Sequence, residues 1–186
     1  LYMRGQHVAA SIVALAGEGI LLVAAWRWSG PDLARIGVLT LAACSSEQVP
    51  IDSPDPTSSA DEAACRALID GLPDTVDDKL RRPVHPDDAW GAAWGDDPPI
   101  TLTCGGRMPE SFSRFSQCEV ANGVGWYAEE ATADDQAVPA VITTVGFEPI
   151  VTVVIPARDR PEGVAATMID LSAALTKHLD LVKPCV

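Results

Sequence analysis

Two apolar stretches stand near the start of the chain, and later apolar positions fall into shorter runs broken by polar residues. Residues 8–26 are apolar apart from Ser11, Glu18 and two glycines, and a second apolar run covers residues 36–43. A short basic segment, an apolar run and small residues ahead of a processing point are typical of an export signal. The pattern therefore predicts an export or membrane segment, followed by a folded domain.

Helical periodicity marks both ends of that domain. Ser59 and Glu62 match the S-x-x-E capping box, which satisfies two free backbone N–H groups at a helix start. Gly71, followed by Pro73, ends this first helix. A second helix is predicted beyond Pro161, where apolar residues recur at helical spacing. These residues are Val164, Met168, Leu171, Leu175 and Leu179.

Short strands are predicted between the two helices. Asn122-Gly123 is the strongest short hairpin signal in the chain, and Gly146 to Pro149 separates a second pair of β-rich runs. The order helix, antiparallel strands, helix predicts an α+β domain. We expect an N-terminal helix, an antiparallel sheet of short strands and a C-terminal helix packed on one face. The predicted strands cover residues 100–104, 118–120, 124–127, 141–145 and 150–155.

The sequence around Cys44 predicts how the chain is anchored. Leu41-Ala42-Ala43-Cys44 resembles the lipobox of bacterial lipoprotein signal peptides, in which the cysteine receives a diacylglycerol thioether and becomes the new N-terminus. Alternatively, residues 8–26 span the membrane and Cys44 is a buried thiol. The chain opens with Leu1, and an upstream extension from a misassigned start would explain the length before Cys44.

Three regions follow from these patterns. Residues 1–43 are the export signal or membrane segment, and residues 44–58 are a lipid-anchored tether rich in Pro and Ser. Residues 59–186 form the extracytoplasmic α+β domain. Both ways of anchoring the chain place this domain on the extracytoplasmic face of the cell membrane.

Four cysteines follow Cys44, and their even number in an exported domain predicts two disulfides. Three connectivities are open, of which we favour Cys104–Cys118 and Cys65–Cys185. The sequence contains no C-x-x-C pair, so zinc or thioredoxin-like chemistry is not indicated. No cofactor is expected.

The net negative charge of the chain limits which partners it can bind. The chain carries 13 Lys and Arg against 26 Asp and Glu. The first 43 residues hold three of the basic and two of the acidic residues, so the remainder has a net charge of −14. Nucleic-acid binding needs a basic face, so nucleic acid is excluded as a partner. The remaining candidates are the membrane, through the anchor, and an envelope protein or wall component.

Two clusters could bind a ligand. Trp90 and Trp94 would share one side of a helical turn, where exposed indoles could stack on sugars or peptides; alternatively both are core anchors. Arg81 and Arg82, with Lys79, are the main basic spot and could dock an anionic wall polymer or an acidic protein tail. Alternatively they neutralise the neighbouring Asp77-Asp78 pair.

Acidic pairs recur along the domain. Paired carboxylates could serve glycoside hydrolysis or Ca²⁺ binding, or they could form a solvated acidic surface. The sequence contains no H-E-x-x-H, G-x-S-x-G or P-loop motif. An enzyme is therefore not indicated, and a hydrolase remains an alternative. The pairs closest to the tryptophans are Asp87-Asp88 and Asp96-Asp97.

An ordered series of short motifs runs through residues 48–185. It comprises ACRALIDGLPDTV at 64–76, RRPV at 81–84, AAWG at 92–95, ITLTCG at 100–105, NGVGW at 122–126 and TTVG at 143–146. Together these motifs resemble the actinobacterial domain-of-unknown-function family 3515. The resemblance implies an exported envelope lipoprotein or single-span membrane protein and implies no catalytic residue set. We therefore favour a noncatalytic binding or scaffolding domain, with a glycan or small-ligand binder using Trp90 and Trp94 as the alternative.

Overall fold

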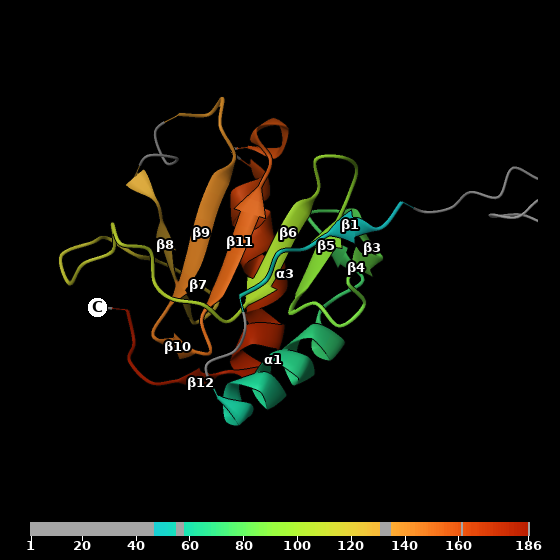
Figure 1. The fold of residues 1–186 in the computed structure, drawn as a ribbon. Helices are drawn as coiled ribbons and strands as arrows, with labels where there is room; N and C mark the ends of the chain where they lie inside the picture. The colour runs from blue at the N-terminus through green and yellow to red at the C-terminus, as the bar shows by residue number, and fades with distance from the viewer. Residues whose placement is uncertain (1–46, 55–57, 131–134, 161, 186) are drawn as a thin grey trace, which may run out of the picture. The chain divides into compact units, whose positions relative to one another are not determined.

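The computed structural model describes residues 47–54, 58–130, 135–160 and 162–185 (Figure 1). These residues belong to one compact unit of the chain. The predicted export or membrane segment and the predicted lipidation site, Cys44, lie outside the described ranges. Among the residues that are described, no helix combines the length and the apolar character needed to cross a membrane.

An eight-stranded sheet forms the centre of the domain, and every pairing within it is antiparallel. Its strands lie in the order β2 (Thr75–Val76), β3 (Lys79–Arg82), β5 (Gly91–Trp94), β6 (Ile100–Cys104), β11 (Val151–Ile155), β9 (Ala140–Val145), β8 (Val124–Ala128) and β7 (Glu119–Ala121). Two smaller pairings flank it. The parallel pair is β1 (Val49–Pro50) with β4 (Val84–His85), and the antiparallel pair is β10 (Phe147–Glu148) with β12 (Asp180–Leu181).

Both long helices pack on one face of this sheet, which we call the helix-facing side (Figure 1). They are α1 (Ser59–Gly71) and α3 (Glu162–His178), and a short 3₁₀ helix, η1 (Ala157–Asp159), precedes α3. The predicted α+β class, the two helices and the antiparallel sheet of short strands are all confirmed.

Strand alternation places the core. Ile100, Leu102 and Cys104 of β6 point to the helix-facing side and are fully buried, because successive side chains of a strand point to opposite faces. The intervening Thr101 and Thr103 lie on the outer side and are half-buried. Strand β11 repeats this pattern, and α1 and α3 close the core with Leu68, Met168, Leu171 and Leu175.

Local turn chemistry explains two predicted boundaries. The hairpin between β7 and β8 is confirmed: Asn122 (φ 47°) and Gly123 (φ 85°) both adopt the positive φ that a type I′ turn requires.

The predicted cap of α1 is wrong by one residue. Ser58, rather than Ser59, is the N-cap, and its hydroxyl oxygen accepts the Asp61 N–H at 3.1 Å.

The segment around the two tryptophans is a strand, not the helical turn predicted from their spacing. Ala92 and Trp94 of β5 join the core on the helix-facing side, and Ala93 is buried on the outer side. Both faces of this strand are therefore covered. The outer cover comes from residues predicted to be tether, because Val49 and Ile51 pack on Ala93.

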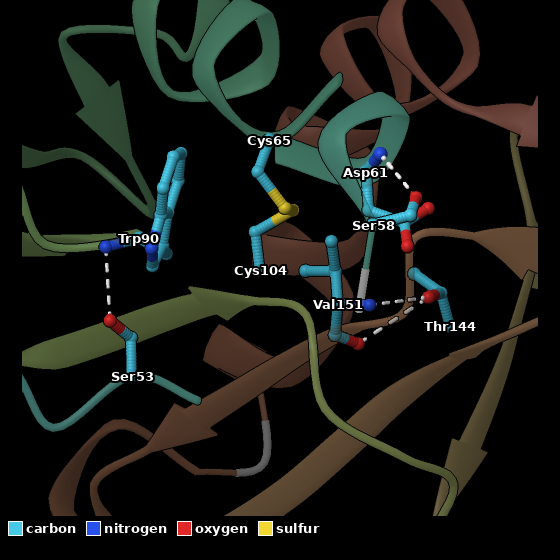
Figure 2. Close-up of a disulfide and its surroundings, with 8 residues drawn as sticks. All are labelled: Ser53, Ser58, Asp61, Cys65, Trp90, Cys104, Thr144 and Val151. Carbon is cyan, nitrogen blue, oxygen red and sulfur yellow. Dashed lines mark hydrogen bonds between the residues drawn. A yellow bond between two sulfur atoms is a disulfide. The ribbon is translucent and has the colours of Figure 1, made fainter. Parts of the chain in front are cut away.

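The two predicted disulfides are confirmed, but the favoured pairing is wrong. Cys65 bonds Cys104 with S–S 2.05 Å, and Cys118 bonds Cys185. Cys104 ends β6 on the helix-facing side, where α1 presents Cys65 (Figure 2). Cys118 precedes β7, which is four strand spacings from β6, or about 19 Å. A Cys104–Cys118 bond would therefore have to cross half of the sheet.

Candidate functional site

The predicted basic spot lines a hollow of about 580 Å³ on the domain surface. We call it the arginine hollow. Strand β3, the turn after β5 and η1 meet around it. Its lining contains four basic residues, Lys79, Arg81, Arg82 and Arg158, together with Asp78, Leu80, Gly95, Asp96 and Asp159.

Arg81 and Arg82 bind main-chain carbonyl oxygens. The Arg81 guanidinium donates to the oxygens of Ile69 (2.9 Å) and Leu72 (3.4 Å) at the end of α1. The Arg82 guanidinium donates to Gly95 O at 3.2 Å and to Glu47 O at 2.9 Å. Because these acceptors are neutral, the two positive charges are not cancelled by the bonds they make. The alternative that this pair neutralises Asp77-Asp78 is therefore wrong for the arginines.

Arg158 completes the hollow, and no sequence pattern indicated its role. Its guanidinium donates to the carbonyl oxygens of Asp96 (2.7 Å), Asp97 (2.6 Å) and Pro98 (2.8 Å), about sixty positions earlier in the chain. A contact over that separation depends on strand order, which local patterns do not encode. Arg158 therefore clamps the turn after β5 while its own side chain stays 40% exposed.

Lys79 pairs with two carboxylates, and the Arg158 Nε lies 3.6 Å from a carboxylate oxygen of Asp159. Its ammonium group binds the Asp77 carboxylate and lies 3.4 Å from Asp159 Oδ1. Burial alone would lower the pKa of Lys79, but the hydrogen bond to Asp77 and the negative charges of Asp159 and Asp77 outweigh it. The net effect raises the pKa of Lys79 above its usual value. The predicted neutralisation is thus right for Lys79 with Asp77, and the second carboxylate that Lys79 contacts is Asp159 rather than Asp78.

The two tryptophans do not form the exposed ligand platform considered above. Trp94 is 0% exposed, and its indole N–H donates to Pro73 O at 3.0 Å. Trp90 is half-buried against the core, and its backbone N–H donates to the Ser53 hydroxyl at 2.9 Å (Figure 2). The Arg66 guanidinium covers the Trp90 ring, 4.5 Å from its centroid. The alternative that the tryptophans anchor the core is correct for Trp94. Trp90 packs against the core but is only partly buried.

The acidic pairs nearest the tryptophans are not brought together. Asp87-Asp88 and Asp96-Asp97 are exposed and stand at opposite ends of β5, whose four residues span about 13 Å. Glycosidase carboxyl groups lie about 5 to 10 Å apart. Within the described parts of the chain, no three His, Cys, Asp or Glu side chains are grouped to hold a metal ion.

A second hollow, of about 420 Å³, lies at the opposite end of the sheet. Its lining mixes aromatic, apolar and acidic side chains drawn from the segment before β7, from β7 and β8, and from α3. Trp126 is buried in the core beside this hollow, and no sequence pattern indicated the hollow itself. The lining includes Phe115, Glu119, Trp126, Tyr127, Glu130 and Met168.

Comparison with known proteins identifies a family. A family model described as "Protein of unknown function (DUF3515)" matches residues 32–184. This confirms the resemblance noted from the motifs. Neither the curated proteins nor the solved structures contain a match.

Proposed function

Since the chain belongs to the family of proteins of unknown function DUF3515, we propose its function from its own residues: a membrane-anchored protein of the extracytoplasmic face. Its domain binds or scaffolds another component of the cell envelope and catalyses no reaction. The partner is an envelope protein or a wall component.

The cysteine arrangement carries this proposal. Four of the five cysteines are joined in two disulfides, and such bonds persist in oxidising compartments outside the cytoplasm. Cys65 and Cys104 are both 0% exposed and link α1 to the central strands, so this bond is part of the core itself. A domain built around such a bond fits an extracytoplasmic location.

The fifth cysteine supplies the anchor. Cys44 follows Leu41-Ala42-Ala43 and stands three residues before Glu47, where the described chain begins. A thioether carrying two acyl chains holds a protein firmly on a membrane, because each buried CH₂ contributes about 0.8 kcal/mol. The disulfides leave this thiol without an intramolecular partner among the other four cysteines.

The charged residues of the arginine hollow favour binding over catalysis. Arg81, Arg82 and Arg158 each hold main-chain carbonyl groups, and Lys79 holds two carboxylates. These bonds fix the hollow as a rigid surface. Such a surface suits binding rather than catalysis.

The anchor is tested by the Cys44→Ala substitution in the full chain. We expect loss of metabolic lipid labelling. Ser45→Ala is the matched control, because it changes the next residue and keeps the thiol; it should retain the lipid label. Unchanged labelling of the Cys44→Ala chain would show that the lipidation site is wrong.

A further inference from the structure

The chain enters the domain beside the arginine hollow. Val49 N–H donates to Pro83 O at 2.9 Å, and Val49 and Pro50 form β1 alongside β4. The Arg82 guanidinium donates to the carbonyl oxygen of Glu47 at 2.9 Å. The point at which the described chain begins is therefore fixed to the end of β3.

The distance from this point to the proposed anchor is short. Three residue steps separate Cys44 from Glu47, and a fully extended chain of that length reaches about 11 Å. A flexible tether over residues 44–58 would have allowed the domain to turn freely, but β1 takes up part of that length. A lipid on Cys44 would hold the β1–β4 pair, and the end of the sheet that contains β3, next to the membrane.

The side chains at this end suit a headgroup surface. Leu80 is 72% exposed and shares the outer side of β3 with Arg82, since residues two apart point the same way. The Arg82 guanidinium donates to carbonyl oxygens, which carry no negative charge. Arg158 also donates to carbonyl oxygens, and its Nε lies 3.6 Å from one carboxylate oxygen of Asp159. The hollow is lined by four basic and three acidic residues, whereas the chain beyond residue 43 has a net charge of −14.

We propose that the surface formed by Leu80, Arg82 and Arg158 rests on the phospholipid headgroups of the membrane that anchors the chain. The guanidinium groups meet headgroup phosphates, and Leu80 enters the apolar boundary beneath them. This inference rests on the proposed lipid anchor at Cys44 and adds to it the orientation of the domain.

The opposite end of the sheet is held away from the membrane in this orientation. Strand β7 lies six strand spacings from β3, or about 29 Å (Figure 1). The second hollow lies there, with Phe115 80% exposed. Phe115 therefore offers a matched control for Leu80: an exposed apolar side chain of the same domain, at the far end of the sheet.

Photo-crosslinking of the full, anchored chain tests the orientation. A photoreactive side chain replaces Leu80 in one sample and Phe115 in the other, and each protein is placed in vesicles of phosphatidylethanolamine and phosphatidylglycerol in equal parts that carry a labelled phospholipid. We expect several-fold more labelled crosslink from position 80 than from position 115, and less from position 80 after the Arg158→Gln substitution. Both positions are exposed, so an unchanged melting temperature will confirm that each variant folds.

Equal crosslinking from the two positions, or crosslinking of position 80 to protein instead of lipid, would overturn this orientation. Metabolic lipid labelling of the Cys44→Ala chain separates that result from a failure of the anchor. If this chain is labelled as fully as the unaltered one, the proposed anchor is wrong and the orientation is overturned with it. If only the unaltered chain is labelled and the two positions crosslink alike, the orientation alone is wrong.

Discussion

Arg81 shows how one side chain can complete a helix that its own sequence leaves unfinished. The last turn of α1 contains no basic residue, and the final carbonyl groups of a helix lack intrahelical partners. Arg81 reaches from β3 to two carbonyl oxygens at this end, those of Ile69 and Leu72. The guanidinium thus joins the first helix to the edge of the sheet.

Removing this contact should destabilise the domain. Hydrogen bonds to charged groups contribute about 1.5 to 3 kcal/mol, so we expect Arg81→Met to lower the free energy of unfolding by about that amount. Denaturant unfolding of the full chain measures the change. Arg114→Met is the control, because Arg114 is exposed and lies over the ring of Phe115. Equal losses in the two variants would contradict the role assigned to Arg81.

Lys79 stabilises the domain at neutral pH, and this contribution is lost at alkaline pH. Its pKa is raised in the folded state, so its stabilising contribution is fully present below the unfolded pKa and is lost as pH rises through the folded value. We expect the difference in unfolding free energy between the unaltered chain and Lys79→Met to hold steady near neutral pH and to shrink above about pH 10.4. A difference that stays constant into the alkaline range would show that the Asp77 and Asp159 contacts contribute nothing.

At the scale of elements, the sequence predicted what local patterns can encode. The apolar residues of α3 recur at helical spacing, and Asn122-Gly123 carries its own turn geometry, so both elements were found. Strand β3 reads Lys-Leu-Arg-Arg with one apolar residue, and β5 is buried on both faces, so neither shows the alternation of a half-buried strand. The arginine hollow depends on both strands and was recognised only in part.

Strand β1 lies in the segment predicted to be a proline-rich tether, but residues of this segment pack in a small apolar cluster. Val49 and Ile51 are buried with Ala93, and a Cβ added at Gly91 would come within 2.7 Å of Ile51 Cγ2 and 2.5 Å of Leu102 O. This close fit explains why glycine occupies position 91. It also means that the strand can be dislodged without touching the main core.

Ile51→Ala should release β1 selectively. Replacing a buried Ile by Ala costs about 2 to 5 kcal/mol, and here the loss falls on a cluster separate from the helix-facing core. We expect faster protease cleavage within residues 47–54, measured by mass spectrometry of the full chain, with the unfolding transition of the rest little changed. Val120→Ala, at a 63% exposed site, should leave cleavage unaltered. Equal cleavage of both variants would show that β1 is not held by Ile51.

Across the whole molecule, the two disulfides close long loops through different parts of the fold. Cys65–Cys104 spans 39 positions and joins α1 to the centre of the sheet, and Cys118–Cys185 spans 67 and joins the C-terminal segment to the edge at β7. The pairing could not be predicted from spacing, because it follows from a strand order that separates β6 from β7 by three strands.

The Cys65–Cys104 disulfide should contribute more to stability than the Cys118–Cys185 disulfide, although it closes the shorter loop. Chain entropy alone assigns about 4 kcal/mol to either bond. Cys65 and Cys104 also fill the core, whereas Cys185 is only partly buried. We therefore expect the paired substitution Cys65→Ala with Cys104→Ala to lower the melting temperature more than Cys118→Ala with Cys185→Ala, as calorimetry of the non-reduced chains will show. The reverse order would mean that fixing the C-terminal segment stabilises the domain more than the bond inside the core does.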